Sequence, residues 1–185
     1  MSTPQAPDIE RVLYSAEQID ARIREVGAAI SERYSGRDLK LIGVLKGSIF
    51  FLTALAREIQ IPIKIDFLAI SSFSPHKAAP GVVRIAKDLD EPIQGEDVLV
   101  VEDIVDTGLT MRYLLQTLAG RGPNSLGICT LLDRTSRRLV QVPVEFRCFE
   151  IGEHFVIGCG LDYKQHYRNL PYVAIMKQGQ KESKG

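Results

Sequence analysis

Residues 98–115, VLVVEDIVDTGLTMRYLL, decide the fold of this protein. Four apolar residues lead directly into the adjacent acids Glu102 and Asp103, and a third acid, Asp106, precedes the sequence Thr-Gly-Leu-Thr and a helical pattern. A strand that is apolar on both faces is typical of the centre of a parallel sheet. We therefore predict a strand over residues 98–101, then an acidic turn, then a helix.

Strands and helices alternate along the rest of the chain. The capping-box pattern Ser15-Ala16-Glu17-Gln18 predicts the start of a helix that runs to about Tyr34. This alternation indicates a doubly wound α/β sheet that is mainly parallel, with ligands at the carboxyl ends of its strands. The other predicted elements are helices at about 49–59 and after residue 108, and strands at 39–45, 63–70, 82–86, 126–132, 144–149 and 154–159.

The length and composition of the chain favour a single-domain protein and argue against some classes of binding partner. The chain has 185 residues, which favours a single domain over residues 1–185. Lys+Arg and Asp+Glu both number 23, so the zero net charge argues against a nucleic-acid binder with an overall basic surface. No apolar run approaches the length of a membrane span, so we expect no membrane partner. Three scattered cysteines and no signal-peptide stretch indicate a cytoplasmic protein with reduced thiols.

The acidic turn combines two opposite chemistries. Backbone N–H groups from Asp106 to Thr110, at the start of a helix, can hold a phosphate, and the hydroxyls of Thr107 and Thr110 can add donors. The carboxylates of Glu102 and Asp103 only accept hydrogen bonds, so they suit sugar hydroxyls or a hard cation. A sugar phosphate satisfies both groups at once.

Other interpretations of this stretch stay open at this point. Adjacent acids after a strand are often a solvated loop, and Thr-Gly before a helix is often only a cap. A phosphoaspartate receiver also gathers acids at strand ends, although it does not require the turn D-T-G-x-T. The glycine patterns of an ATP-binding P-loop and of a Rossmann turn are absent.

The segment VLVVEDIVDTGLT resembles the phosphoribosyl-pyrophosphate signature of type I phosphoribosyltransferases. Four other segments, VLKGSIFF, IDFLAISSF, LLDRTSRR and HFVIGCGLDYKQHYRNLPYV, resemble the hypoxanthine-guanine branch of that family in the same order. The resemblance covers roughly residues 10–177. It implies a parallel five-strand sheet flanked by helices, a small hood from the N-terminal segment and about 134–177, and a mobile loop at about 71–83. It also implies a homodimer or homotetramer.

The resemblance implies roles for the acidic turn. The reaction joins a purine base to C1 of phosphoribosyl pyrophosphate and releases pyrophosphate. Glu102 and Asp103 would hold the ribose hydroxyls and, partly through water, Mg²⁺. Asp106 would be the general base that takes the purine N7 proton, or a helix N-cap, or both. The ribose phosphate would be bound by Asp106, Thr107, Gly108, Leu109 and Thr110.

Two further groups of residues match family motifs. Lys46, Gly47 and Arg168 match contacts of the pyrophosphate, and Asp162 matches a direct magnesium ligand beside the base. Each of these charged residues would otherwise be interpreted as a solvated surface group. Magnesium keeps several waters and binds substrate phosphates with one or two carboxylates, so a small ligand set is sufficient.

The base site is implied by the segment after residue 133. Phe155 matches the ring that stacks on the base, Val156 matches the backbone that reads the purine edge, and Arg134 would donate to the 6-oxo group. Alone, Phe155 would be interpreted as a core residue and Arg134 as a surface or interface residue. Gly158 and Gly160 suggest a bulge or a close approach of the backbone.

This chain departs from the family pattern at two positions. Arg134 stands where the family usually has Lys, which can shift the base contact because a guanidinium is planar and longer. The loop carries Ser72-Phe73 where the family usually has Ser-Tyr. We predict that the ring of Phe73 and the backbone of Ser72 are what loop closure needs.

The sequence thus predicts a magnesium-dependent purine salvage enzyme that uses hypoxanthine and also guanine. Two alternatives remain. One is a related phosphoribosyltransferase that prefers xanthine or another base. The other is a non-enzymatic relative that senses nucleotides, against which the intact Asp106, Lys46-Gly47 and Asp162 argue.

Overall fold

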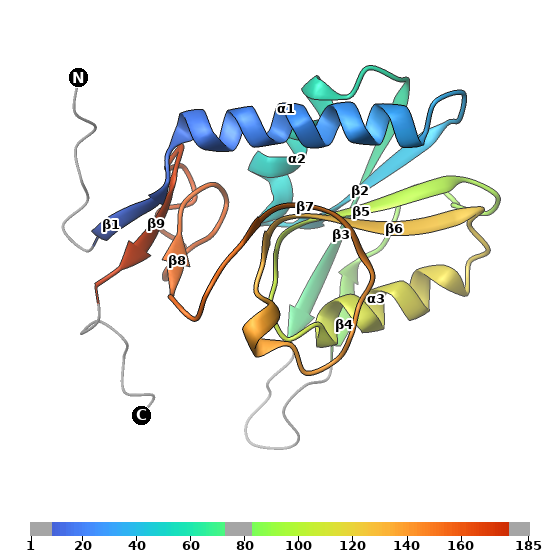
Figure 1. Cartoon of the computed structure of the whole chain (residues 1–185). Coiled ribbons are helices and arrows are strands. Elements are labelled where there is room, and N and C mark those ends of the chain that lie inside the picture. Colours follow the sequence, from blue (N-terminus) through green and yellow to red (C-terminus); the bar gives the residue numbers. More distant parts are fainter. Residues whose placement is uncertain (1–8, 73–82, 178–185) are drawn as a thin grey trace.

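The computed structural model describes residues 9–72 and 83–177, and within them a six-stranded sheet forms the centre of the molecule (Figure 1). Its strand order is β4-β3-β2-β5-β6-β7. All neighbouring strands run parallel except β4, which pairs antiparallel with β3 at one edge. The predicted mainly parallel sheet is confirmed, but it has six strands rather than five, because the predicted strand at 82–86 forms the antiparallel edge strand β4. The strands are β2 (Leu39–Leu45), β3 (Ile63–Ser72), β4 (Val83–Lys87), β5 (Asp97–Val105), β6 (Ser125–Asp133) and β7 (Val144–Glu150).

Helices cover both faces of this sheet. The helices α1 (Ala16–Arg33) and α2 (Ser48–Glu58) lie on one face and α3 (Leu109–Ala119) lies on the other (Figure 1). The short 3-10 helix η1 (Thr135–Arg137) follows β6. Two separate apolar clusters, one on each face, confirm the doubly wound arrangement. No helix in the described part of the chain is both long and apolar enough to cross a membrane.

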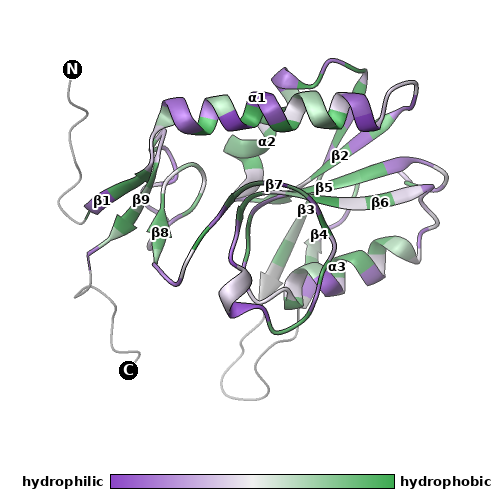
Figure 2. Cartoon of the chain, viewed as in Figure 1, coloured by the Kyte–Doolittle hydropathy of each residue, from purple (hydrophilic) through white to green (hydrophobic). Residues whose placement is uncertain are grey.

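The central strands are apolar because they are covered on both sides. Nearly every residue of β2 and the first five residues of β5 are buried, and Figure 2 shows hydrophobic residues concentrated in the central strands. The helix α1 begins with the predicted capping box. Gln18 N donates to Ser15 Oγ at 3.3 Å, and Ser15 N donates to the Gln18 side chain at 2.9 Å.

The strand β5 runs further than predicted. It ends at Val105 rather than at residue 101, so Glu102 and Asp103 lie within the strand and not in the turn. Backbone pairing continues because β6 is equally long, with Glu102 opposite Thr130 and Val105 opposite Asp133. Successive side chains of a strand point to opposite faces, so the two acids diverge.

A second, three-stranded antiparallel sheet stands beside the main sheet and joins the two ends of the chain (Figure 1). It contains β1 (Ile9–Tyr14), β9 (Val173–Met176) and β8 (Val156–Ile157), in that order. The sequence analysis missed β1 and β9. It also extended β8 to residues 154–159, which was wrong because Gly158, Cys159 and Gly160 have φ values of 95°, 50° and 100° that end the strand.

Candidate active site

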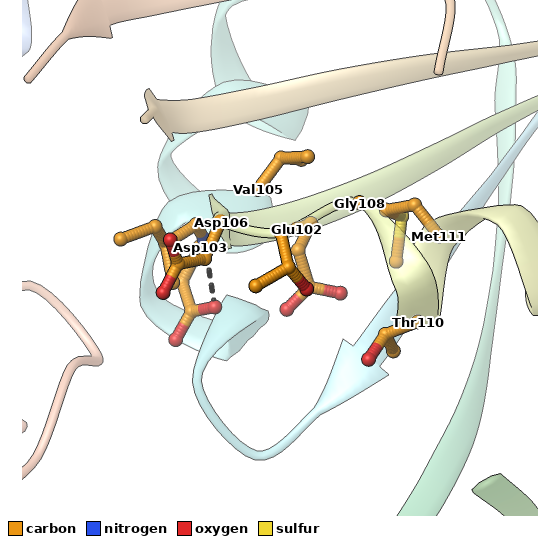
Figure 3. A pocket seen from close by; sticks show the side chains of 9 residues that line it. Glu102, Asp103, Val105, Asp106, Gly108, Thr110 and Met111 are labelled. Carbon is orange, nitrogen blue, oxygen red and sulfur yellow. Dashed lines mark hydrogen bonds between the residues drawn. The ribbon is translucent and has the colours of Figure 1, made fainter. Parts of the chain in front are cut away.

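A cavity of about 170 Å³ opens where β5 meets α3, at the carboxyl edge of the sheet (Figure 3). Figure 3 shows the side chains of Glu102, Asp103, Asp106 and Thr110 around this junction. All the residues come from one continuous stretch, so local chain geometry shapes this site. The lining consists of Glu102, Asp103, Ile104, Val105, Asp106, Thr107, Gly108, Thr110 and Met111.

The turn before α3 is held by the segment after η1. Thr107 O accepts from Leu139 N at 2.9 Å and from Val140 N at 3.2 Å. Gly108 has φ +84°, and a Cβ there would overlap the carbonyl oxygen of Val140. Gly108 is also the N-cap of α3 and has no side chain with which to cap it, and the amide of Leu109 donates to Thr107 Oγ1 only at 3.5 Å. The first amides of α3 therefore point toward the cavity end of the helix, where an anion would bind.

The two adjacent acids have different surroundings. Glu102 is partly exposed as a residue, but its Oε2 atom is buried and has no hydrogen-bond partner in the described structure. Burial raises the pKa of Glu102 well above its usual range, and the neighbouring charge of Asp103 raises it further. Asp103 is buried and accepts from Ile104 N at 2.8 Å. In the described structure, the acceptor Glu102 Oε2 thus receives no hydrogen bond from any donor.

Asp106 does not cap the helix. Its Oδ2 atom accepts from Arg134 Nη1 at 3.0 Å and lies 3.4 Å from Arg137 Nη1. Its other oxygen, Oδ1, is buried without a partner among the residues described. One oxygen of the carboxylate is therefore held by arginine and the other is left to accept.

A second cavity, of about 270 Å³, adjoins the first. The two share Asp103, Ile104 and Asp106. The ring of Phe155 is 42% exposed at this cavity and meets Tyr163 edge-on, with ring centroids 6.0 Å apart. Segments from β5, the end of β6 and the small sheet thus come together here. The lining consists of Asp103, Ile104, Asp106, Arg134, Phe155, Val156, Leu161 and Asp162.

The turn after β2 lies against both the acids and the small sheet. The peptide bond between Leu45 and Lys46 is cis. A Cβ on Gly47 would overlap Asp103 Oδ2, and a Cβ on Gly160 would overlap the carbonyl oxygen of Gly47. The close backbone approach predicted at Gly160 is confirmed, and it brings Gly47 beside the acidic strand.

Arg168 and Asp162 pair with each other. Arg168 Nη2 lies 2.6 Å from Asp162 Oδ1, and Arg168 Nη1 donates to Gly160 O at 2.7 Å. Asp162 also accepts from Gln165 N at 2.9 Å. These contacts hold the segment 160–168 together, and its Gly160 approaches the turn at Gly47. Ser72 is the last residue of β3, and Phe73 lies outside the described residues.

Comparison with known proteins shows the family of the chain. The model of the phosphoribosyl transferase domain matches residues 13–164. The chain is 48% identical over 175 residues to the hypoxanthine-guanine phosphoribosyltransferase of Mycobacterium avium, covering 91% of this chain and 86% of that one. It is 50% identical over 164 residues to the hypoxanthine phosphoribosyltransferase of Salmonella typhimurium, covering 88% and 92%.

A solved structure of a hypoxanthine phosphoribosyltransferase from Staphylococcus aureus superposes with a TM-score of 0.90 at 38% identity, covering 96% of both chains. The chain belongs to the phosphoribosyltransferase family. This family acts on phosphoribosyl pyrophosphate, and generally with a divalent metal.

The side chains of this phosphoribosyltransferase could supply only part of the ligands of such a metal. In residues 9–72 and 83–177, no group of three or more His, Cys, Asp and Glu side chains is arranged to hold an ion. The unpartnered Glu102 Oε2 and the carboxylates of Asp103 and Asp162 are hard oxygen donors. A donor set of this kind suits an ion that takes most of its ligands from water and substrate phosphates.

The sequence analysis missed Arg137, whose Nη1 atom lies 3.4 Å from Asp106 Oδ2. The pattern DRTSRR could have indicated this contact. Residues three apart in a 3-10 helix lie on the same side, and η1 begins directly after Arg134, so Arg137 lies on the same side as Arg134. The carbonyls of Gly152 and His154, which accept from Arg134, carry no such signal.

We predict that Gly160→Ala destabilises the protein by at least about 2 kcal/mol more than Gly36→Ala. Both glycines have positive φ, but only at Gly160 would the new Cβ overlap another backbone. Thermal unfolding should show Tm lower by roughly 4–8 °C for the first variant relative to the second. Equal Tm values would contradict the close contact with Gly47.

We predict that Glu102→Gln stabilises the ligand-free protein at pH 8 by about 1 kcal/mol, or roughly 2–4 °C in Tm. The raised pKa means that ionising Glu102 costs stability. The cost is absent below the ordinary value of 4.5, grows as the pH rises from there toward the raised value, and is constant above it, so the difference should shrink at pH 5. The exposed Glu153→Gln is the control, and a similar gain there would refute the explanation.

Proposed function

We propose that this phosphoribosyltransferase serves purine salvage by transferring the 5-phosphoribosyl group from phosphoribosyl pyrophosphate to hypoxanthine and guanine. The products are IMP or GMP and pyrophosphate. One observation carries the proposal: the acid-lined cavity at the start of α3 and the cavity beside Phe155 share the wall formed by Asp103, Ile104 and Asp106. A sugar phosphate in the first would present C1 to a base in the second.

The ribose phosphate would bind at the start of α3. Amides from Asp106 to Thr110 and the hydroxyls of Thr107 and Thr110 supply donors for the phosphate. The carboxylates of Glu102 and Asp103 accept from the ribose hydroxyls. A ligand hydroxyl at Glu102 Oε2 would also give that atom the partner it lacks.

Asp106 is the proposed general base. Asp106 lines the cavity of the base, and its carboxylate, whose buried Oδ1 atom lacks a partner in the described structure, would accept the purine N7 proton. Bond breaking at C1 develops positive charge on the ribose. The carboxylates of Glu102, Asp103 and Asp106 stabilise that charge because they are already held in place before the reaction.

The base would lie against the exposed ring of Phe155, with the backbone of Val156 along its edge. Arg134 offers only donors, so it favours an acceptor at position 6 of the purine over the amino group of adenine. This donor supports 6-oxopurines as a class. Hypoxanthine and guanine differ at position 2, where a backbone group would make the contact.

The leaving pyrophosphate would be held by Lys46, the amide of Gly47 and Arg168. Mg²⁺ is the proposed cofactor, with Asp162 as a direct ligand and Glu102 and Asp103 as further ligands, partly through water. Bound magnesium would neutralise charge on the pyrophosphate. Closure over the site is proposed for the loop of about 71–83, through the backbone of Ser72 and the ring of Phe73.

We predict nucleotide formation from phosphoribosyl pyrophosphate and magnesium with hypoxanthine or guanine as the acceptor, and none with adenine. Asp106→Asn should lower kcat/KM by about 100-fold, because the amide cannot take the N7 proton. Product formation followed by chromatography, with each base assayed separately, measures both effects. Turnover on xanthine alone would favour the related enzyme, and no turnover with any base would favour the nucleotide-sensing alternative.

A homodimer or homotetramer is proposed from the surface of α2. Ile49 and Phe50 are 41% and 43% exposed there, next to the turn at Lys46-Gly47. The adjoining groove carries two arginines and two acids, which could pair across a self-complementary two-fold contact between identical copies. The charged residues of this groove are Asp20, Arg24, Arg57 and Glu58.

We predict that Phe50→Glu dissociates the oligomer, because it places a charge in the apolar part of that contact. Light scattering after size exclusion would show the mass falling to 20.6 kDa. Leu139→Glu, at a residue 70% exposed on another segment, is the matched control. An unchanged mass for Phe50→Glu would place the interface elsewhere.

The proposed location is the cytoplasm. The cysteines are free, with Cys129 and Cys148 buried and Cys159 partly buried. Burial raises the pKa of Cys148 to about 12 and that of Cys159 to about 11. Thiols of this kind are suited to packing rather than to disulfide formation.

A further inference from the structure

Arg134 is buried in the protein rather than directed freely into the base cavity. Its side chain is 7% exposed, although it lines that cavity. Its main-chain N–H donates to Val105 O at 2.9 Å, so it stands beside the residue that precedes Asp106. The end of β6 and the end of β5 are thereby tied together at Arg134.

The guanidinium of Arg134 joins three protein acceptors. Nε donates to Gly152 O at 3.1 Å, Nη2 donates to His154 O at 2.7 Å, and Nη1 donates to Asp106 Oδ2 at 3.0 Å. A guanidinium is planar and holds its donors in a fixed fork. Two carbonyls therefore set the plane of the group, and that plane directs the third donor to Asp106.

This arrangement distinguishes the two oxygens of Asp106. Oδ2 is held by Arg134, and the buried Oδ1 has no partner in the part of the chain described. Arg134 thus determines which oxygen is left for a substrate proton. Lysine could reach one of the three acceptors but could not span them, because its donors all lie on a single atom.

We infer that Arg134 is a positioning residue that acts through Asp106, and that it also fixes the segment 152–154 ahead of Phe155. The inference rests on the proposed function and adds to the direct contact with the base proposed there. It concerns an arginine that stands where the family pattern has lysine. In this chain, one side chain would align the general base with the segment that carries the stacking ring.

Arg137 provides the contrast within the same cluster. It also lies near Asp106 Oδ2, at 3.4 Å, but its side chain is 51% exposed. It is held by no contact to the segment 152–154 among those described. A role that required only positive charge near Asp106 would be shared by both arginines, whereas alignment of the carboxylate requires Arg134.

A double-mutant cycle in kcat/KM for hypoxanthine tests the inference. Arg134→Lys should lower kcat/KM by about 10-fold, mainly through kcat. In the Asp106→Asn background the same change should cost clearly less than in the parent protein, because the carboxylate that Arg134 aligns is gone and only its contacts with the base and with the segment 152–154 remain. Arg137→Lys should change kcat/KM by less than about 2-fold in either background.

Two results would overturn the inference. One is a full loss of about 10-fold for Arg134→Lys in the Asp106→Asn background, which would mean that Arg134 acts on the base alone. The other is unchanged kinetics for Arg134→Lys in the parent protein, because the three-acceptor bridge would then be unnecessary.

Hydrogen–deuterium exchange tests the same contact without any turnover. Arg134→Lys should increase amide exchange in residues 152–156 relative to the parent protein, and Arg137→Lys should not. Equal exchange in all three proteins would refute the positioning role. If the parent protein transferred no phosphoribosyl group to any purine, the proposed function would fail, and the exchange result would still decide the role of Arg134.

Discussion

The packing of the Asp103 carboxylate and the Gly160 backbone around Gly47 is the constraint on which the site depends. The turn after β2 has no room for a side chain at Gly47. The carboxylate of Asp103 lies against Gly47, and Gly160 approaches the carbonyl oxygen of Gly47. The acidic strand and the segment 160–168 are therefore held at one point. Arg168 reinforces this junction through Gly160 O and Asp162.

The site also contains buried acceptor atoms to which the described part of the protein supplies no donor. Glu102 Oε2 and Asp106 Oδ1 are buried without partners in the described structure, which is costly for folding. Exceptions of this kind are expected at functional sites, where a ligand supplies the missing contact. The arginines near Asp106 reduce this cost on one oxygen only. Stability and binding are therefore opposed at the end of β5.

Local pattern predicted most of the main sheet. The apolar runs at β2 and β5 indicated strands covered on both faces, and the capping box indicated the start of α1. The prediction ended the strand β5 too early because Glu102 is polar. In the structure, the backbone of Glu102 still pairs with that of Thr130 in β6. The strands β1 and β9 were missed because β1 pairs with β9 across the length of the chain, and β9 pairs on its other side with β8.

The sequence by itself determined the chemistry of the acidic turn, since Glu102, Asp103, Asp106 and the amides before α3 belong to one continuous segment. It also indicated the family through motifs of fixed spacing. Only the tertiary structure decided which groups those acids face. The pairing of Arg134 with Asp106, Gly152 O and His154 O joins segments up to 28 residues apart. Such contacts follow from how β5, β6 and the small sheet pack, because no local pattern specifies the partner of a donor across a fold.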